Sequence, residues 1–414
     1  MKSSFSSRLV NYWPRLAEGL LWTMVLGLFL SRALLSLSIG LFFLLAFFRL
    51  GWRRWWMEAT QDRLVWILGS LWLLPFLSGG WSADLSAWGD VIRIKLPLLL
   101  LPLGWMGLSL EKQAWERLGW GLVVCAFGGV VYSLLPWLQD AVTVQADYLR
   151  GKSLPTPLGN DRVRFSWLIV GILWWLHQQW GMASRQKQRW ILALGLFFVL
   201  YLHVLAVRIG LVCFYLLAGF LLLRQGMQPR HRRTALTLMA LLLILPFILY
   251  RTLPTFRARI DYIRYDWSYT LQGKYLPGGN DAIRMQSLQA AGTCIRNGPI
   301  YGAGFGDIRS AMDSVYARLQ RELTADERIY PANEWGVYGV GMGWVGMIGF
   351  SILMIGLFFL RSTDPFRWRC WVLVTVLSFV TDIGLEVQYG VFLVPFLFLF
   401  FRSADRLKNQ EIRG

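Results

Sequence analysis

Long apolar runs separated by short polar linkers make up most of the chain, and this pattern predicts an all-α polytopic membrane protein with about 12 transmembrane helices. Several runs are shorter than the roughly 20 apolar residues of a typical span, so we expect tilt or tight packing there. The break between the first two runs, SRALLSLS, is the weakest in the series. The expected spans are Ala17–Leu30, Leu34–Phe48, Leu64–Gly79, Leu96–Leu110, Leu118–Leu138, Phe165–Trp180, Ile191–Val207, Ile209–Leu223, Ala235–Tyr250, Trp335–Leu360, Cys370–Thr381 and Val391–Phe401.

One long polar segment, Arg251–Trp335, lies between expected spans 9 and 10. We therefore divide the chain into residues 1–250 (spans 1–9), residues 251–335 (a large external helical loop holding the active site) and residues 336–414 (spans 10–12 and a tail). Within the loop, Asn280 and Asp281 favour an N-cap and Gly298-Pro299 a stop, which predicts a helix from Asn280 to Asn297.

A second loop helix is expected over Asp307–Ala325, where apolar residues recur at helical spacing. Such a helix, flanked by membrane spans, should lie on the membrane surface or over the mouth of the bundle. Its expected apolar face consists of Ile308, Met312, Val315, Leu319 and Leu323.

Composition agrees with a membrane protein, because 56% of the 414 residues are hydrophobic and only 16% are charged. A soluble domain of this size would need more polar surface. The net charge of +18 is also typical of nucleic-acid binders. Here, however, Lys and Arg lie mainly in short linkers between apolar runs, where they determine topology. We therefore expect membrane lipids as partners and no nucleic acid.

The basic linkers predict the orientation. They fall on one side of the membrane if the spans alternate, and the positive-inside rule makes that side the cytoplasm. Both termini are then cytoplasmic, and the basic leader MKSSFSSRLVNYWPRL reads as a retained segment. The basic groups are Arg49–Arg54, Arg185–Arg189, Arg230–Arg233, Arg361–Arg369 and, in the tail, Arg402, Arg406, Lys408 and Arg413. The loops Trp81–Lys95, Gln139–Arg164 and Arg251–Trp335 would face the periplasm of a Gram-negative cell.

Four arginines lie at the expected external boundary or in the external loop. Arg208 interrupts HVLAVRIGLVCFY, while Arg162 and Arg164 begin an expected span and Arg284 lies early in the first loop helix. A charge at a membrane boundary should face a wet cavity or an anionic partner. Converging guanidinium groups suit a diphosphate, which they bind in a bidentate manner. The alternatives are snorkelling of Arg208 and a structural ion-pair network with Asp161, Asp281 or Asp307.

The glycine cluster Gly302-Ala-Gly304-Phe-Gly306 separates the two expected loop helices. It is either a plain glycine turn or a backbone nest whose N–H groups face a phosphate. A dinucleotide-binding fold fits poorly, because no strand is expected before the cluster.

Several short motifs resemble those of the O-antigen ligase and polymerase superfamily of bacterial membrane glycosyltransferases. Each motif is short, but their order and their common external placement make the set specific. Together with the span pattern, the resemblance covers most of the chain. The resembling motifs are VRFS at 163–166, AVRIGL at 206–211, NDAIR at 280–284, NGPIYGAGFGD at 297–307, YPANE at 330–334 and the glycine-rich GVGMGWVGMIG at 339–349.

The resemblance implies an inverting, metal-independent glycosyltransferase of the bacterial inner membrane with a GT-C-like helical bundle and no cofactor. The donor would be a glycan on undecaprenyl diphosphate. The acceptor would be a sugar hydroxyl of lipid A–core or of a growing glycan. Carried over by position, Arg164, Arg208 and Arg284, with Arg162 nearby, would bind the diphosphate and stabilise the charge on the leaving group.

The sequence departs from the family pattern at Ala332, where the family has a histidine that positions or deprotonates the acceptor. Alanine cannot accept a proton. Three explanations remain open: a deliberate His→Ala change that inactivates the enzyme, Glu334 acting as the base beside Asn333, or a family member without activity. Glu334 also has a structural interpretation, as a cap for the following span.

Three functions follow. The first is a ligase that transfers a glycan to lipid A–core or another surface acceptor, and the second is a polymerase with the same chemistry. The third belongs to another class, a non-catalytic transporter of the lipid-linked glycan. A transporter should have broken helices and polar groups at mid-membrane, whereas the polar groups here crowd at the external side, which favours an enzyme.

Overall fold

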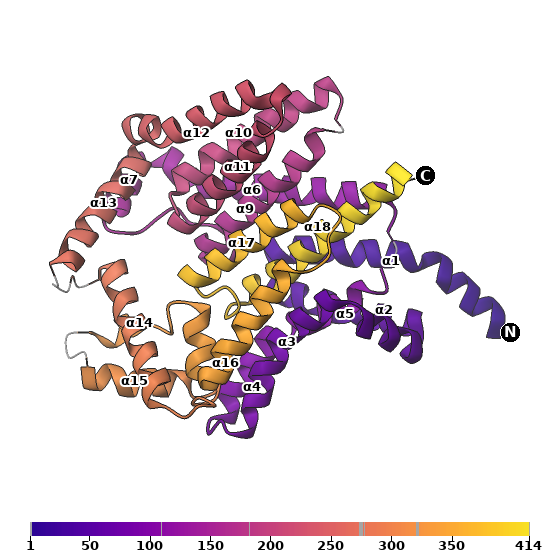
Figure 1. Ribbon diagram of the computed structural model, residues 1–414, viewed down its shortest axis with the longest axis horizontal. Helices are drawn as coiled ribbons and strands as arrows, with labels where there is room; N and C mark the ends of the chain where they lie inside the picture. Colours follow the sequence, from indigo (N-terminus) through magenta and orange to yellow (C-terminus); the bar gives the residue numbers. More distant parts are fainter. Residues whose placement is uncertain are drawn as a thin grey trace.

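The computed structural model describes residues 2–108, 110–181, 183–272, 276, 278–319 and 323–413, with side chains from 12 to 404 except that of Leu319. Throughout these residues the secondary structure is helical, with no strand, and the helices pack into one bundle (Figure 1). The all-α prediction is confirmed. The basic tail side chains Arg406, Lys408 and Arg413 lie outside the described side chains.

In the described part of the chain, seven helices are long and apolar enough to cross a membrane. The expected number of about 12 is therefore not confirmed. The seven are α2 (Arg32–Gln61), α3 (Arg63–Leu77, continued by η1, Ser78–Gly80), α6 (Lys112–Gln139), α10 (Arg185–Leu205), α11 (Arg208–Gly226), α12 (Arg232–Thr252, preceded by η2, Pro229–His231) and α16 (Glu334–Phe358).

The remaining helices are not both long and apolar enough over their described residues to be counted as spans. Expected span Leu96–Leu110 forms only a nine-residue helix, too short to cross a membrane alone. These remaining helices are α1 (Lys2–Leu30), α4 (Leu85–Lys95), α5 (Pro97–Trp105), α7 (Ala141–Leu149), α8 (Pro157–Asn160), α9 (Arg162–Trp180), α13 (Pro254–Leu271), α14 (Asn280–Asn297), α15 (Ile308–Leu319), η3 (Ala325–Glu327), α17 (Pro365–Thr381) and α18 (Gln388–Arg413).

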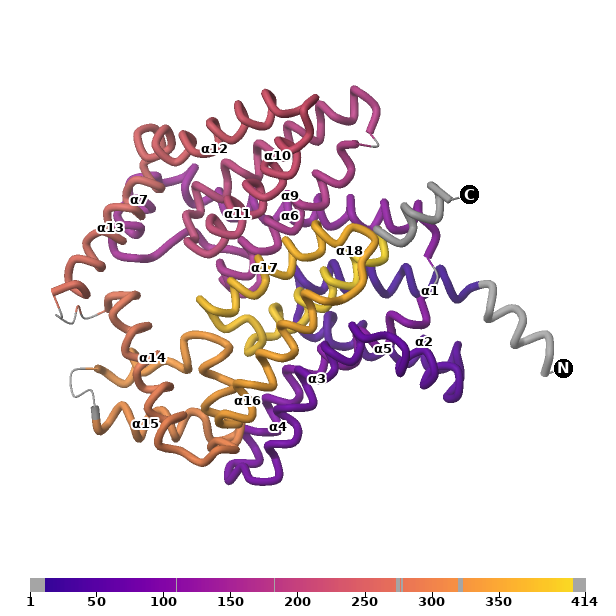
Figure 2. The backbone as a smooth tube through the Cα atoms, viewed as in Figure 1, coloured from indigo at the N-terminus to yellow at the C-terminus, as the bar shows by residue number. Residues whose placement is uncertain are grey.

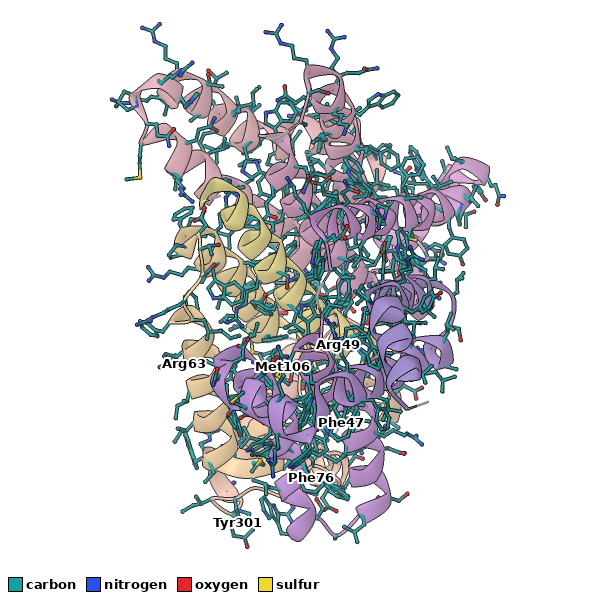
Figure 3. The ribbon with its side chains drawn as sticks, turned by 90° about the vertical axis from the view of Figure 1, so that its right-hand side faces the viewer. Phe47, Arg49, Arg63, Phe76, Met106 and Tyr301 are labelled. Atoms are coloured by element: carbon teal, nitrogen blue, oxygen red, sulfur yellow. The ribbon has the colours of Figure 1, made fainter. Side chains whose placement is uncertain are left out.

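Burial distinguishes central from peripheral helices. Every side chain from Val391 to Phe401 is buried. This part of α18 therefore lies in the centre of the bundle, which explains why it is apolar on all sides. In contrast, α12 exposes Leu241, Leu243 and Phe247, an apolar face suited to lipid. At another edge, the Arg49 side chain lies beside Met106 and donates to the Gly107 carbonyl at 2.5 Å, which joins α2 to the end of α5 (Figure 3).

The weak break between the first two expected spans is a turn. Helix α2 begins after Ser31, whose hydroxyl accepts a bond from the Leu34 N–H at 3.4 Å. A Cβ on Gly27 would lie only 2.8 Å from the Leu35 nitrogen, so glycine allows α1 and α2 to meet closely.

The polar segment between α12 and α16 is helical, and its helices α13, α14 and α15 lie along one side of the bundle, at the left in Figure 1. Helix α14 has the predicted bounds, but its N-cap is Gly279 rather than Asn280 or Asp281. The caps come from α13: the Tyr262 hydroxyl accepts from the Asn280 N–H at 3.2 Å, and Asp266 accepts from the Asp281 N–H at 3.0 Å.

The second loop helix, α15, begins one residue after the predicted start and has Ile308 and Met312 buried, as predicted. Its predicted extension to Ala325 is wrong where it can be tested, because residues 323 and 324 are not helical. Residues 320–322 and the Leu319 side chain lie outside the described part. Helix α13 was not predicted at all.

Helix α16 lies between α3 and α14 (Figure 2). It is broken at Met342–Gly343, where Gly343 has φ 61° and ψ −149°. The loop before α15 fills the break. Ala303 N–H donates to the Val340 carbonyl and Gly304 N–H to the Gly341 carbonyl, each at 2.9 Å. The interrupted helix therefore has its backbone satisfied by the polar segment.

Candidate functional site

Arg208 occupies the first position of α11 because α10 ends abruptly before it. Ala206 adopts a left-handed conformation, φ 50°, and Val207 is the extended N-cap. The Tyr148 hydroxyl supports this turn by donating to the Val204 carbonyl at 2.8 Å. A non-glycine residue in this conformation is uncommon and persists when its surroundings hold it.

A positive charge at a helix N-terminus opposes the helix dipole, so Arg208 requires an anionic partner. Asp281, at the start of α14, supplies one through a bidentate pair with N–O distances of 2.7 and 2.6 Å. The Arg208 side chain remains 37% exposed. It therefore retains an accessible surface while being held in place.

Arg164 and Arg284 share a second carboxylate, Asp382, which follows α17. Arg164 lies 3.7 Å from Asp382 and 3.3 Å from Asp161, and Arg284 lies 3.6 Å from Asp382. Arg284 also donates to the Thr381 carbonyl. One guanidinium nitrogen of Arg164, Nη2, is buried without a hydrogen-bond partner. A buried donor of this kind is costly unless a ligand or water satisfies it.

Arg162 and Arg259 complete the group. Arg162 donates to the Ser153 hydroxyl at 3.2 Å, and Arg259 donates to the Gly151 carbonyl at 2.9 Å, so both border the loop before α8. Burial lowers the pKa of Arg259 to about 10, and the nearby charges of Arg162 and Arg208 contribute. We call Arg162, Arg164, Arg208, Arg259 and Arg284 the arginine cluster.

The arginine cluster contains both the predicted arginines and the alternative ion-pair network. Arg208 pairs with Asp281 and Arg164 with Asp161, as that alternative proposed, whereas Asp307 accepts from the Ala83 and Asp84 N–H groups elsewhere. Five guanidinium groups meet four carboxylates (Asp161, Asp266, Asp281 and Asp382), an excess of one positive charge. The N-termini of α9, α11 and α14 add to it.

Asp266 is the most perturbed of these four carboxyl groups. Burial raises the pKa of Asp266, and the Asp281 carboxylate raises it further. One of its oxygens, Oδ1, is buried without a hydrogen-bond partner. Asp266 therefore holds its proton more readily than an exposed aspartate does.

A cavity of 480 Å³ opens beside the arginine cluster. Arg150, Lys152 and Arg162 line it together with Asn160 and Asn280, and its lining contains no carboxylate among the described residues. Lys152 also pairs with Asp147 at 3.3 Å. This arrangement of three basic side chains and two amides can hold an anion of phosphate type.

Ala332 and Asn333 lie against α14. The Ser287 hydroxyl of α14 donates to the Tyr330 carbonyl at 3.1 Å, and Arg284 lies about one helical turn before Ser287. Ala332 is buried, and the Asn333 side chain caps α16 by accepting from the Gly336 N–H at 2.7 Å. The cap that was one interpretation of Glu334 is thus provided by Asn333.

Glu334 points into the bundle and has no exposed surface. One of its oxygens accepts from the Leu385 N–H, and the other has no hydrogen-bond partner. A general base must reach the hydroxyl that it deprotonates. The placement of Glu334 therefore disfavours its role as the base for an external acceptor.

Lys95 forms a buried ion pair that sequence reasoning missed. Predicted to end an external loop, it has no exposed surface and binds Glu386, between α17 and α18, while also donating to the Leu385 carbonyl at 2.8 Å. The Tyr338 ring lies 5.3 Å from its ammonium group. Together with Glu334, these contacts fix the loop that carries Asp382.

The nest interpretation of Gly302, Gly304 and Gly306 is wrong. Each backbone N–H from 302 to 307 already donates to a protein acceptor, including the Ser78 and Ser82 hydroxyls of the α3–α4 connection. No N–H of these six residues remains for a phosphate. The loop instead joins the polar segment to α16 and to the α3–α4 connection.

Gly304→Ala should destabilise the protein. Gly304 has φ 99°, and a Cβ there would lie 2.3 Å from the Ser82 hydroxyl, so the backbone must shift. Gly292→Ala is the matched control, because a Cβ there meets nothing within 4 Å and alanine favours its helix. Thermal unfolding in detergent should show a lower midpoint for Gly304→Ala only. Equal midpoints for both variants would contradict the packing role.

The sequence matches no protein-family model and no curated protein.

Proposed function

We propose that this protein is an O-antigen ligase-type glycosyltransferase of the bacterial inner membrane. It would transfer a glycan from undecaprenyl diphosphate to a sugar hydroxyl of lipid A–core or another surface acceptor. The observation that carries the proposal is the arginine cluster, in which side chains from α9, α11, α13 and α14 meet beside a basic cavity. The type of reaction is inferred from the resemblance of the motifs around Arg164, Arg208 and Arg284 to those of the O-antigen ligase and polymerase superfamily.

In this proposal the arginine cluster stabilises the leaving group. As the glycosidic bond breaks, negative charge develops on the diphosphate, and guanidinium groups already held by Asp281 and Asp382 need little reorganisation to stabilise it. The buried Arg164 Nη2, without a partner, is a donor that this charge would satisfy. The chemistry requires no residue to act as a nucleophile.

The finer architecture also belongs to the proposal. We propose a GT-C-like bundle of about 12 spans, to which α1, α5, α9, α17 and α18 contribute together with the seven helices that are long and apolar enough to span. Both termini are cytoplasmic. The arginine cluster and residues 251–335 then face the periplasm.

A polymerase of the same superfamily would use the same donor site, so it remains the alternative enzyme. A transporter is less well supported. Helix α16 is broken as transporter helices are, but carbonyls at its break accept from the Ala303 and Gly304 N–H groups and are not left to coordinate a substrate.

The lipid profile of a deletion strain tests the proposal. Loss of a ligase should leave long polymer on undecaprenyl diphosphate, whereas loss of a polymerase should leave single repeat units. If the purified protein in detergent transfers glycan from synthetic undecaprenyl-diphosphate donor to a lipid A–core acceptor, the ligase is directly supported. A deletion strain with an unchanged profile of lipid-linked and transferred glycan would overturn both enzymes.

Ala332→His should raise the transfer rate if the natural enzyme carries a histidine there. The new imidazole would lie beside α14 and could position or deprotonate the acceptor hydroxyl, a contribution of roughly 10²- to 10⁴-fold for a well-placed acid–base group. The transfer assay above measures it, with Ala332→Gln as the control that adds bulk and hydrogen bonding without a base. An unchanged rate would exclude position 332 as the site of a missing base.

A further inference from the structure

Lys95 lies at a depth in the bundle where an ionised side chain is costly. Helices α4 and α5 follow one another from Leu85 to Trp105 with only Leu96 between them, and Lys95 is the last residue of α4, about halfway along. Its side chain has no exposed surface, and its ammonium group lies 5.5 Å from the Phe305 ring. An ionisable residue in such a place normally has a function and a charged partner.

Two buried carboxyl groups surround this single ammonium group. Glu386 pairs with Lys95 directly, and Lys95 also donates to the Leu385 carbonyl at 2.8 Å. Glu334 binds the same residue from the other side, since it accepts from the Leu385 N–H. We call Lys95, Glu334 and Glu386 the buried triad. When both acids are ionised, the buried triad has an excess of one negative charge.

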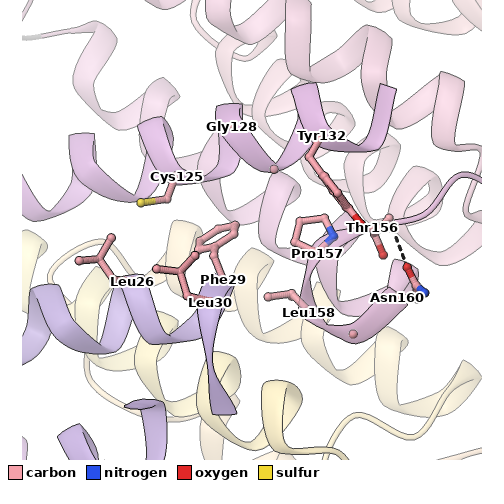
Figure 4. A pocket seen from close by; sticks show the side chains of 12 residues that line it. Leu26, Phe29, Leu30, Cys125, Gly128, Tyr132, Thr156, Pro157, Leu158 and Asn160 are labelled. Carbon is pink, nitrogen blue, oxygen red and sulfur yellow. Dashed lines mark hydrogen bonds between the residues drawn. The ribbon is translucent and has the colours of Figure 1, made fainter. Parts of the chain in front are cut away.

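One oxygen of the buried triad lacks a donor. Glu334 has no exposed surface, and its Oε2 has no hydrogen-bond partner. The basic cavity does not reach the triad, and neither does a second, apolar cavity of 570 Å³ between α1 and α6, because none of the three residues lines either one (Figure 4). A buried carboxylate oxygen without a donor is costly, and a proton on the carboxyl group removes its charge.

The groups around Glu334 leave a proton as the cation that fits. In the described part of the chain, no cluster of three or more acidic, His or Cys side chains could hold a metal ion. The charge of Arg164, on α9, acts on both acids of the triad. Arg164 therefore connects the triad to the arginine cluster. The charged or titratable groups that face Glu334 are Lys95, Arg164, Glu386, Tyr330 and Tyr338.

The arginine cluster has the opposite excess. Its five guanidinium groups exceed its four carboxyl groups by one positive charge, whereas the buried triad has one negative charge too many. In the protein alone the two excesses cancel. An anion bound at the cluster removes this compensation, and the negative charge of the triad then remains in a site of low dielectric constant.

We propose that Glu334 and Glu386 form a proton-binding site linked to the arginine cluster, so that binding of a diphosphate anion at the cluster is accompanied by uptake of a proton by the buried triad. The two carboxyl groups would share this proton, and no other group need move between the sites. The inference goes beyond the proposed function, but its link rests on the anion site that this function requires. By reciprocity, protonation of the triad then strengthens anion binding.

Infrared spectroscopy tests the proton site without any ligand. A protonated carboxyl group absorbs apart from carboxylates and amides, so difference spectra of the purified full-length protein during a pH titration detect it. We expect a carboxylic acid band that is lost or shifted in Glu334→Gln and in Glu386→Gln. Glu18→Gln, which alters an acid paired with Arg117 on α6, is the matched control and should retain the band. A spectrum insensitive to both triad substitutions would overturn the proposal.

Calorimetry tests the link. The probe is dimethyl diphosphate with one methyl ester on each phosphate, which has no group that titrates near neutral pH. Titrations in buffers with different heats of ionisation give the number of protons taken up per probe bound. We expect uptake of up to about one proton, with an affinity that falls by up to about tenfold for each unit of rising pH across the titration of the triad.

The triad variants assign the proton. Glu334→Gln should bind the probe with no uptake and with an affinity that does not change with pH, while Glu18→Gln should match the unsubstituted protein. Unchanged uptake in both Glu334→Gln and Glu386→Gln would overturn the proposal. Probe binding and glycan transfer without proton uptake would overturn this inference alone. Proton uptake without glycan transfer would overturn the proposed function alone. If the probe does not bind, both the diphosphate site and the link to it are overturned.

Discussion

Arg208→Gln should reduce glycan transfer by roughly 10²- to 10³-fold, the loss seen when one preorganised group that stabilises developing charge is removed. Glutamine keeps hydrogen-bonding groups at the start of α11 but removes the charge and the bidentate pair with Asp281. The transfer assay with synthetic undecaprenyl-diphosphate donor measures the effect. Arg284→Ala should be similarly damaging, because Arg284 shares Asp382 with Arg164.

The other end of α11 provides the matched control. Arg224 pairs with Asp364 at 2.8 Å and is 43% exposed, close to the exposure of Arg208. Arg224→Gln therefore removes a comparable ion pair from the same helix, away from the proposed site, and should leave transfer nearly unchanged. Equal transfer by Arg208→Gln and Arg224→Gln, with both proteins folded, would remove Arg208 from the mechanism.

Parts of this architecture could be predicted because their signals are local in sequence. The bounds of α14 follow from an Asn-Asp start and a Gly-Pro stop, and the turn after α1 follows from one polar break. Even so, the cap of α14 was assigned to the wrong residues. Tyr262 and Asp266 provide it from another helix, and no local pattern carries that information.

Helix α13 was missed because its buried face mixes polar residues with apolar ones. The residues it turns inward include Arg259, Tyr262 and Asp266, whereas periodicity analysis looks for apolar residues at that spacing. Its one local signal was Pro254 at the first helical position. The omission also hid Arg259 from the list of site arginines, since only the fold brings it beside Arg162 and Arg208.

The same reasoning explains why the glycine loop was ambiguous. Three glycines in five residues fit a phosphate nest and a packing turn equally well, and only the partners of their N–H groups distinguish the two. The Gly302 N–H donates locally to the Pro299 carbonyl, but the partners of Gly304 and Gly306 are Gly341 in α16 and Ser82, each more than 30 residues away. Glycines in a sequence show where unusual backbone conformations are allowed. Tertiary contacts then determine whether the N–H groups there bind a phosphate or pair with other parts of the protein.

Lys95→Met should destabilise the protein by about 3–5 kcal/mol, the cost of leaving one member of a buried ion pair uncompensated. Methionine fills a similar volume, so the main loss is the charge that balances Glu386 and the donor to the Leu385 carbonyl. Thermal unfolding in detergent should show a large fall in the midpoint. Lys112→Met, which alters an exposed pair with Glu116 at 3.9 Å, should have little effect.

The stability of Lys95→Met should also depend on pH, and the direction follows from the pKa of Glu386. Burial raises the pKa of Glu386 above its ordinary value, and the Lys95 charge opposes that shift. Without Lys95 the pKa should rise further. The folded state then binds the proton more tightly than the unfolded state, so lowering the pH stabilises the variant relative to the unsubstituted protein. A stability difference that stays constant with pH would contradict the assignment of the loss to charge.

A second substitution separates charge from packing. Lys95→Met combined with Glu386→Gln removes both charges, and replacing a buried pair by neutral groups is often nearly neutral. We expect the double variant to regain most of the lost stability and to lose the pH dependence. Transfer activity should return with stability if Lys95 acts only by holding the loop of Asp382, because Arg164 and Arg284 would regain their partner. Restored stability without restored transfer would instead indicate that the charges of Lys95 and Glu386 act directly in the reaction.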